Sequence, residues 1–333
     1  MPENKSATSC DTCFITWHLQ SRSRNIASRL NIPIYELEVR GNAFKRHFLS
    51  SLWTLGLIAK KRPASLIIQY SFLLLVIMAF YKLFRPKRVT IIADCHTKAL
   101  RRRASKYLDI LFWPLKRWSF KYADTIIISN IALTQEAAQL NSQVIALPDP
   151  IPDFSRIHND KNGEKYCVFI SSFASDEPIR EMAEAAALLE PDLPLLWTGR
   201  VPNSLLNMME FSDNIRFTSY LEDDDYQRLL KNAQCLIILT NEEGCLMSGA
   251  YEGLAAGVPM VLSDTEALRG FFGRSALYCN HTPENIAATV KQAIIDGEAL
   301  RQNSLKIRDE REREFASHLA KLKHALIANK APF

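Results

Sequence analysis

Residues 234–264 constrain the fold more than any other segment, because apolar runs and polar turns alternate there in a fixed order. Residues 234–240 form a continuous apolar run of strand length, which is typical of a parallel strand covered on both faces. A loop with Glu242 and Glu243 follows, and then a helical pattern that begins near Ser248. A glycine ends this helix, and a proline leads into a second apolar run. The order predicts a parallel β-α-β unit.

The same alternation runs through the whole chain of 333 residues, which is longer than one hydrophobic core usually supports. Residues 147–153 contain three prolines and are interpreted as a stiff linker. We therefore predict an α/β protein of two Rossmann-like domains. Further strands are expected at 13–17, 65–69, 89–93, 125–129, 144–147, 166–170 and 195–197, with helices at 25–30, 72–84 and 180–189 among those between them.

The net charge of +5 is unevenly divided. Residues 1–150 carry a net +13, and the remainder carries a net −8. Two halves of opposite charge are expected to face different partners.

Other features bear on compartment and membrane insertion. The apolar stretch 66–84 is interpreted as a strand followed by a helix, and a membrane span is the alternative. The seven cysteines have no framework spacing, and the lone pair Cys10 and Cys13 does not predict a zinc site. A reducing compartment is expected, and the N-terminus shows no apolar leader.

The chemistry of residues 240–252 favours a nucleotide-sugar. A helix that opens at the carboxyl end of a parallel strand presents free N–H groups to an anion. Carboxylates beside it can accept hydrogen bonds from sugar hydroxyls. This combination suits a phosphate joined to a polyol, and the alternative is an ordinary strand–helix unit whose glutamates are merely solvated. Candidate donor-binding residues in this segment are Thr240, Ser248, Gly249, Tyr251 and Glu252.

This segment resembles the donor-site signature of GT-B glycosyltransferases of the family 4 type. In that pattern a first glutamate contacts the donor sugar and a second holds the ribose. Glu252, in Tyr-Glu-Gly-Leu-Ala-Ala-Gly-Val-Pro, matches the second glutamate. The family spacing puts the first at Gly244, so Glu243, one residue early, is the candidate for the donor-sugar role.

Other segments extend the resemblance over most of the chain. Ser172–Pro178 is similar to the Phe-Ala-x-Asp-Glu-Pro loop of bacterial and archaeal family-4-like transferases, and Asp94-Cys-His96 to their Asp-x-His element. The resemblance implies a GT-B fold whose two parallel sheets face each other across a cleft. Residues 1–150 would bind the acceptor and 151–309 the donor, with a C-terminal helix at about 310–333 crossing back to the first domain.

The resemblance departs from the family in the loop after the first strand of the second domain. Many family 4 enzymes place an Arg and a Lys there, where this chain has Ser171, Ser172, Asp176 and Glu177. The developing charge on a diphosphate leaving group still needs stabilisation. Arg200 is the first candidate; for Arg180 and Arg269 a surface role is equally expected. Ser172 is retained as a donor-binding candidate.

Two further motifs involve titratable residues. His96 follows a buried strand, and we expect it in the cleft, where it would contact the donor sugar or assist the acceptor hydroxyl, with Asp94 orienting it. The alternatives are a structural histidine and a helix-capping Asp94. Asp223-x-Asp225 has the metal-binding spacing of GT-A transferases, but it precedes a helical pattern and is interpreted as helix N-terminal charge. No metal or other cofactor is expected.

Residues 98–121 combine eight basic residues with aromatic and aliphatic ones. This pattern is typical of a helix on an anionic membrane surface, and no nucleic-acid module accompanies it. The sequence thus predicts a metal-independent hexosyltransferase at the cytoplasmic face of the membrane. It would use a nucleotide-diphosphate sugar and a lipid-linked saccharide acceptor, retain the anomeric configuration and serve surface polysaccharide assembly. The alternatives are a sugar-nucleotide epimerase or hydrolase, or a degenerate GT-B partner subunit.

Overall fold

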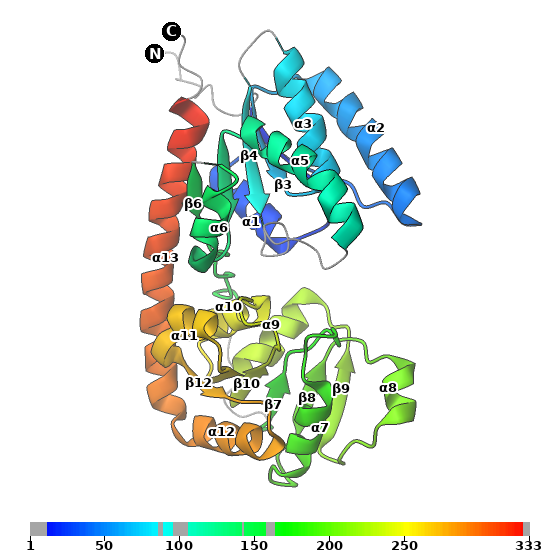
Figure 1. The fold of residues 1–333 in the computed structure, drawn as a ribbon. Coiled ribbons are helices and arrows are strands. Elements are labelled where there is room, and N and C mark those ends of the chain that lie inside the picture. Colours follow the sequence, from blue (N-terminus) through cyan, green and yellow to red (C-terminus); the bar gives the residue numbers. More distant parts are fainter. Residues whose placement is uncertain (1–11, 86–88, 96–105, 142, 158–163, 329–333) are drawn as a thin grey trace. The chain divides into compact units, whose positions relative to one another are not determined.

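The structure, a computed structural model, describes residues 12–85, 89–95, 106–141, 143–157 and 164–328. The chain divides into two compact units, Met1–Pro150 together with Glu314–Phe333, and Ile151–Arg313. Each unit holds a six-stranded sheet with helices on both faces (Figure 1). All pairings between named strands are parallel. The predicted α/β class is confirmed.

In the first unit the strand order is β2-β1-β3-β4-β5-β6. The strands are β1 (Thr12–Thr16), β2 (Ile34–Glu36), β3 (Ser65–Gln69), β4 (Thr90–Cys95), β5 (Thr125–Ile128) and β6 (Val144–Ala146). The helices are α1 (Ser21–Leu30), α2 (Ala43–Lys61), α3 (Phe72–Phe84), α5 (Lys106–Tyr122) and α6 (Thr134–Ala138), with a 3-10 turn at Ile131–Leu133.

Two hydrophobic layers cover this sheet. On one face, Ile58 of α2, Met78 of α3 and Phe120 of α5 pack against the strands. On the other face, Ile26 of α1 meets Phe315 of the last helix. The stretch 66–84 is the predicted strand followed by a helix. Among the described residues, no helix is long and apolar enough to cross a membrane.

In the second unit the strand order is β9-β8-β7-β10-β11-β12. The strands are β7 (Cys167–Phe169), β8 (Leu195–Thr198), β9 (Ile215–Ser219), β10 (Cys235–Ile238), β11 (Met260–Ser263) and β12 (Ala276–Cys279). The helices are α7 (Ile179–Ala187), α8 (Asn203–Met208), α9 (Asp223–Asn232), α10 (Ser248–Ala256), α11 (Glu266–Phe272), α12 (Pro283–Ile295) and α13 (Gly297–Ala328), with a 3-10 turn at Gly273–Ser275. From Glu314 onward, α13 belongs to the first unit.

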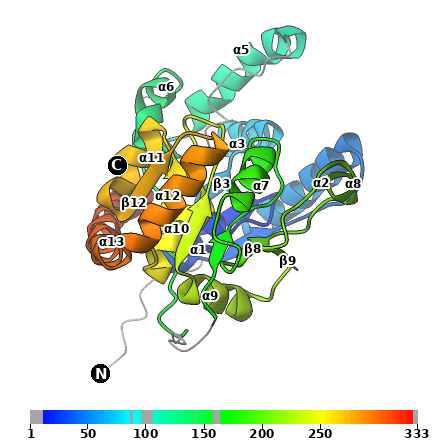
Figure 2. The same ribbon diagram turned by 90° about the horizontal axis from the view of Figure 1, so that it is seen from below.

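The second sheet is also covered on both faces. Met182 of α7 and Val290 of α12 belong to one layer. Leu230 of α9, Leu254 of α10 and Phe272 of α11 belong to the other. Figure 2 shows α7 and α9 on opposite sides of these strands. With both faces buried, the strands must be apolar throughout, which is why continuous apolar runs marked them in the sequence.

Candidate functional site

The strand order of the second unit fixes where a ligand site is expected. The order β9-β8-β7-β10-β11-β12 runs outward from β7 in one direction and from β10 in the other. In open parallel sheets, ligands bind at such a switch point, outside the carboxyl ends of the strands. The loop after β7 and the loop after β10 therefore border the candidate site.

Asp176 joins these two loops. Its Oδ2 accepts a hydrogen bond from the Thr240 hydroxyl at 2.9 Å, and its backbone oxygen accepts from the Asn241 N–H at 2.6 Å. Thr240 is buried and also donates its N–H to the hydroxyl of Ser263, at the end of β11. The structure thus gives Thr240, a predicted donor-binding residue, a bracing position beneath the site.

Glu177 occupies the loop after β7. One carboxylate oxygen accepts from the Ser172 N–H at 3.0 Å and the Ser172 hydroxyl at 2.7 Å. The other accepts from the Phe173 N–H at 3.1 Å and from the Ser171 hydroxyl. Phe173 has a φ of 58°, and consecutive N–H groups around a left-handed residue make an anion-binding concavity. The anion in this concavity is the protein's own carboxylate, so Ser172 directs its donors to Glu177.

Helix α10 opens at the same edge of the sheet. Its N-cap is Met247, whose side chain makes no capping hydrogen bond, and the exposed Ser248 follows. Gly249 is buried, and a Cβ there would lie 3.0 Å from the Ile170 side chain, so glycine allows the helix to approach the end of β7. The helix ends at Gly257, whose φ of 65° is left-handed, as the sequence predicted.

Glu252, one turn into α10, is held by a tyrosine from the neighbouring helix. The hydroxyl of Tyr226 on α9 donates to Glu252 Oε2 at 2.6 Å. Burial raises the pKa of the Glu252 carboxyl, and the hydrogen bond from Tyr226 opposes that rise. The pKa of Tyr226 is raised as well, by burial first and by the charge of Glu252 second. One carboxylate oxygen is fixed in this way, and the other can accept a hydrogen bond from a ligand hydroxyl.

Tyr251, the residue before Glu252, points into the core. It is 2% exposed, and its ring lies 5.0 Å from that of Phe271 and 5.6 Å from that of Phe272. The assignment of Tyr251 to donor binding is therefore corrected. Neighbouring residues of a helix face different directions, and it is Glu252 that faces α9 while Tyr251 packs beneath α11.

The side chain of Glu243 contacts the N-terminus of another helix, α11. Its side chain is exposed, and Oε1 accepts the backbone N–H of Glu266 at 3.0 Å, at the first residue of α11. A carboxylate at a helix N-terminus is stabilised there by unpaired N–H groups and the helix dipole. Glu243 thus remains at the carboxyl edge of the sheet, with a helix end as its partner.

The three candidate cations, Arg180, Arg200 and Arg269, differ in their ion pairs and in the contacts of their side chains. Arg269 pairs with Asp264 and lies 4.5 Å from the ring centre of Tyr278, so its charge is engaged. Arg200 follows β8 and is exposed, and none of the residues that the structure describes pairs with it. Arg180 is exposed in the first turn of α7. Of the three candidates, Arg200 and Arg180 thus have exposed side chains without an ion pair among the described residues, whereas Arg269 is paired.

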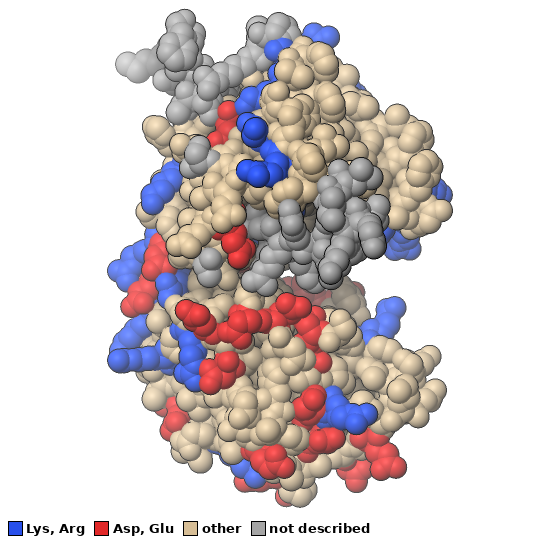
Figure 3. All heavy atoms as spheres, viewed as in Figure 1, with Lys and Arg blue, Asp and Glu red and all other residues tan. Residues whose placement is uncertain are grey.

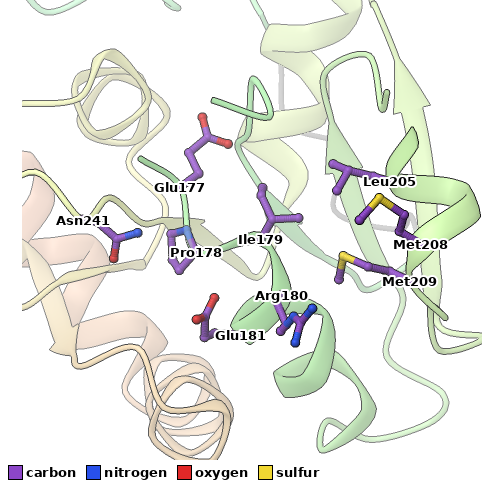
Figure 4. A pocket seen from close by; sticks show the side chains of 9 residues that line it. All are labelled: Glu177, Pro178, Ile179, Arg180, Glu181, Leu205, Met208, Met209 and Asn241. Atoms are coloured by element: carbon purple, nitrogen blue, oxygen red, sulfur yellow. The ribbon is translucent and has the colours of Figure 1, made fainter. Parts of the chain in front are cut away.

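A cavity of about 350 Å³ lies beside the strand ends (Figure 4). Figure 4 shows Glu177 and Asn241 at one side and, at the other, Leu205 and Met208 of α8 with Met209, which follows the helix. The remaining lining residues are Pro178, Ile179, Arg180 and Glu181. Arg180 is the only predicted donor-binding residue in this lining. Ser248 and Glu252 do not line this cavity.

His281 completes the edge and was not identified from the sequence. Its Nε2 lies 2.8 Å from the Ser263 hydroxyl, and its Nδ1 lies 2.8 Å from Asn241 Oδ1. Burial lowers the pKa of His281, with Glu181 opposing this shift. The neutral ring links the ends of β10, β11 and β12. The signal in the sequence was weak, because the short strand before His281 was not recognised.

Asp94 in the first unit has a structural partner that the sequence did not suggest. It is fully buried, and both carboxylate oxygens accept hydrogen bonds from Arg22, one of them at 2.9 Å. Arg22 also pairs with Asp149 and donates to the backbone oxygen of Leu147 at 2.8 Å. This ion pair ties β4 to the chain after β6, whereas the histidine that Asp94 would orient and the segment that it would cap fall outside the described residues. His96 lies outside the described residues.

The structure also describes the acidic residues at the start of α9 and part of the basic stretch 98–121. Asp223 and Asp225 lie in the first turn of α9, where Asp225 pairs with Arg228 at 2.6 Å. Within the described ranges, no group of three or more His, Cys, Asp or Glu side chains could hold a metal ion. Residues 98–105 of the basic stretch lie outside the described residues. In α5, Phe112 is exposed and Phe120 is buried in the core.

Comparisons with known proteins agree with this architecture. Residues 164–296 match the family model "Glycosyl transferases group 1". No curated protein matches the sequence significantly. Among solved structures, the sucrose-phosphate synthase of Thermosynechococcus elongatus has a TM-score of 0.71 at 12% identity, over 94% of this chain and 97% of that one.

Two other solved structures are similar over almost the whole chain. Alr3699/HepE of Anabaena in complex with UDP has a TM-score of 0.68 at 10% identity, over 93% of this chain and all of that chain. WaaG, a glycosyltransferase involved in lipopolysaccharide biosynthesis, has a TM-score of 0.65 at 11% identity, over 95% and 99%. The protein thus has the GT-B fold of glycosyltransferases. Residues 164–296, within its second unit, match the Glycosyl transferases group 1 model, in agreement with the sequence motifs of that segment.

Proposed function

We propose that this protein transfers a hexose-type sugar from a nucleotide-diphosphate donor to a hydroxyl of a lipid-linked saccharide. The bond between the anomeric carbon and the diphosphate oxygen breaks, the acceptor oxygen bonds to that carbon, and the acceptor proton leaves with the nucleoside diphosphate. Retention of the anomeric configuration, independence of metals and a role in surface polysaccharide assembly at the cytoplasmic face of the membrane belong to the same proposal.

The observation that carries the proposal is the position of Glu252. Its carboxylate is largely buried beside the opening of α10, with Oε2 fixed by Tyr226. In this geometry the carboxylate would accept a hydrogen bond from a ribose hydroxyl. The free N–H groups at the opening of α10 and the guanidinium of Arg200 would receive the diphosphate.

The nucleotide is proposed by analogy in fold. HepE has been solved with UDP and with UDP-glucose. We therefore propose a uridine diphosphate sugar as the first donor to test. The membrane setting is proposed from the surface of the first unit. Phe112 of α5 is exposed and lies within the basic stretch 98–121, which supports contact with a lipid surface that would present the acceptor.

The test is calorimetric binding of UDP, GDP, ADP and their sugars to the wild type and to Glu252→Ala. We expect one nucleotide class to bind, and we expect the variant to bind it about ten- to hundred-fold more weakly, since a hydrogen bond to a charged group contributes about 1.5–3 kcal/mol. Glu184→Ala, an exposed glutamate on α7, serves as the matched control. Absence of binding by every nucleotide would refute the transferase proposal and favour the degenerate partner subunit.

Product analysis separates the two enzymatic alternatives. A transferase should release nucleoside diphosphate at a rate that depends on added lipid-linked acceptor. A hydrolase would release free sugar at the same rate without acceptor, and an epimerase would convert the donor without releasing the nucleotide.

A further inference from the structure

Helix α2 carries a row of large apolar side chains that no described part of the protein covers. Phe44, Phe48, Leu52 and Leu55 are 81%, 53%, 51% and 47% exposed. Their spacing of four, four and three residues places them on one face of the helix. Phe44 and Phe48 stack with their ring centres 6.2 Å apart. An apolar row of this length on a surface helix marks an interaction site.

The row is distinct from the face that anchors the helix. Thr54 and Ile58 are buried against the unit, and Thr54 accepts a hydrogen bond from the indole N–H of Trp17 at 2.9 Å. The helix is therefore already held by one side. Its outward residues are not needed to attach it, so they can be changed without removing core contacts.

The charges around the row identify the partner's chemistry. Residues 43–61 contain no Asp or Glu, whereas Lys45 and Arg46 lie in the first turn and Lys60 and Lys61 in the last. Cations in a first turn oppose the helix dipole, which favours anions at that end. Basic residues thus lie near both ends of the helix that carries the apolar row. An anionic surface could pair with these charges.

The neighbouring helices continue this character. In Figure 1, α2, α3 and α5 lie on the same side of the first sheet. Helix α3 also lacks acidic residues and exposes Leu83 and Phe84. Figure 3 shows mainly tan atoms over α2 and α3, with blue at the margin. Exposed apolar side chains without acidic neighbours in the same helix therefore occur on α3 as well as on α2.

We propose that the outward face of α2 docks on an anionic lipid bilayer. Phe44, Phe48, Leu52 and Leu55 enter the boundary between headgroups and acyl chains, and the basic residues at both ends contact lipid phosphates. A second copy of the chain is disfavoured as the occupant, because a symmetric contact would bring the basic ends of two α2 helices, which contain no acidic residue, against each other. The inference rests on the membrane setting of the proposed function and names a docking face for it, and it requires the first unit's surface but no donor binding.

Vesicle co-sedimentation of the full chain tests the proposal. The vesicles are phosphatidylglycerol mixed with phosphatidylcholine, and phosphatidylcholine alone. We expect binding to the anionic vesicles that weakens with salt. The double variant Phe48→Ser, Leu52→Ser should lower the partition coefficient at least about ten-fold, because it removes two side chains from the interface. Lys45→Glu with Arg46→Glu should weaken the preference for anionic lipid, because it reverses the charge at one end of the row.

The matched control replaces two exposed apolar residues of the second unit, Leu188→Ser with Ile295→Ser, and should leave binding unchanged. Circular dichroism and nucleotide binding of the Phe48, Leu52 variant should match the wild type, which separates this inference from the proposed function. Failure of the wild type to bind anionic vesicles, or equal binding by the double variant, would overturn it. So would a wild-type dimer that the double variant dissociates, because α2 would then be an interface between copies.

Discussion

The hydroxyl of Tyr226 donates a 2.6 Å hydrogen bond to Oε2 of Glu252. The two residues come from adjacent helices, α9 and α10, and both lie largely within the protein. A carboxylate that loses water on burial stays ionised only if hydrogen bonds replace that water. Tyr226 is therefore a positioning residue: it fixes one oxygen of Glu252 and keeps the other aligned for a ligand hydroxyl.

Replacing Tyr226 by Phe should weaken nucleotide binding, and more so in acid. Burial raises the pKa of Glu252 and the Tyr226 hydrogen bond lowers it, so the variant should carry a Glu252 of still higher pKa. Loss of one hydrogen bond to a charge predicts binding about ten-fold weaker near neutral pH. Calorimetry across a pH series measures this. A pH dependence identical to that of the wild type would contradict the proposed role of Tyr226.

Replacing Glu177 by Ala should destabilise the second unit. The carboxylate accepts from two N–H groups and two hydroxyls of Ser171, Ser172 and Phe173, and these donors would lose their partner. Water can reach part of the loop, so we expect a loss of about 2 kcal/mol in the free energy of unfolding. Urea titration measures it, with Glu184→Ala as the control.

Glu177→Gln refines this test. The amide keeps one acceptor oxygen but turns two donors toward other donors, so its stability should lie between that of the wild type and that of Glu177→Ala. If both Glu177 variants have the same urea midpoint of unfolding as the wild type, the Glu177 carboxylate does not stabilise the loop at residues 171–173.

Local patterns in the sequence were sufficient for the second unit's central motif. The apolar run of β10, the glycine with positive φ that ends α10 and the apolar run of β11 all lie where predicted. These elements are specified by nearby residues, because a strand buried on both faces must be apolar and a left-handed helix end favours glycine.

Partnerships between distant residues could not be derived in the same way. Arg22 and Asp94 are separated by 72 positions, and nothing near either one indicates the other. Helix α2 was missed for a different reason. It is apolar on its outward face as well as toward the core, which blurs the helical period.

Replacing Arg22 by Met should strongly destabilise the first unit. The change leaves Asp94 as an unpaired carboxylate in a fully buried position, and breaking a buried pair in this way costs about 3–5 kcal/mol. Chemical denaturation of the variant measures the loss. The double variant Arg22→Met, Asp94→Leu should recover much of it, because the fully buried charge of Asp94 is then gone and only the partly exposed Asp149 lacks its partner. A double variant no more stable than Arg22→Met would show that the loss does not come from the stranded charge.

The stability of the second unit should fall in mild acid through His281. Burial lowers its pKa below the ordinary histidine value, so the neutral ring is favoured in the folded protein and protonation is favoured in the unfolded chain. The contribution of His281 to stability is therefore present above the unfolded pKa of about 6.5 and is lost as the pH falls through the lower folded value. Protonated Nε2 could no longer accept from the Ser263 hydroxyl.

Thermal unfolding at about pH 7.5 and about pH 5.5 measures this loss, and His281→Gln should reduce the difference between the two pH values. The pKa of His318 is also lowered, by burial first, so the wild type retains a second titrating histidine in the first unit. His318→Gln is therefore the matched control. An acid sensitivity that His318→Gln removes and His281→Gln leaves intact would assign the effect to α13 instead of the strand ends around Ser263.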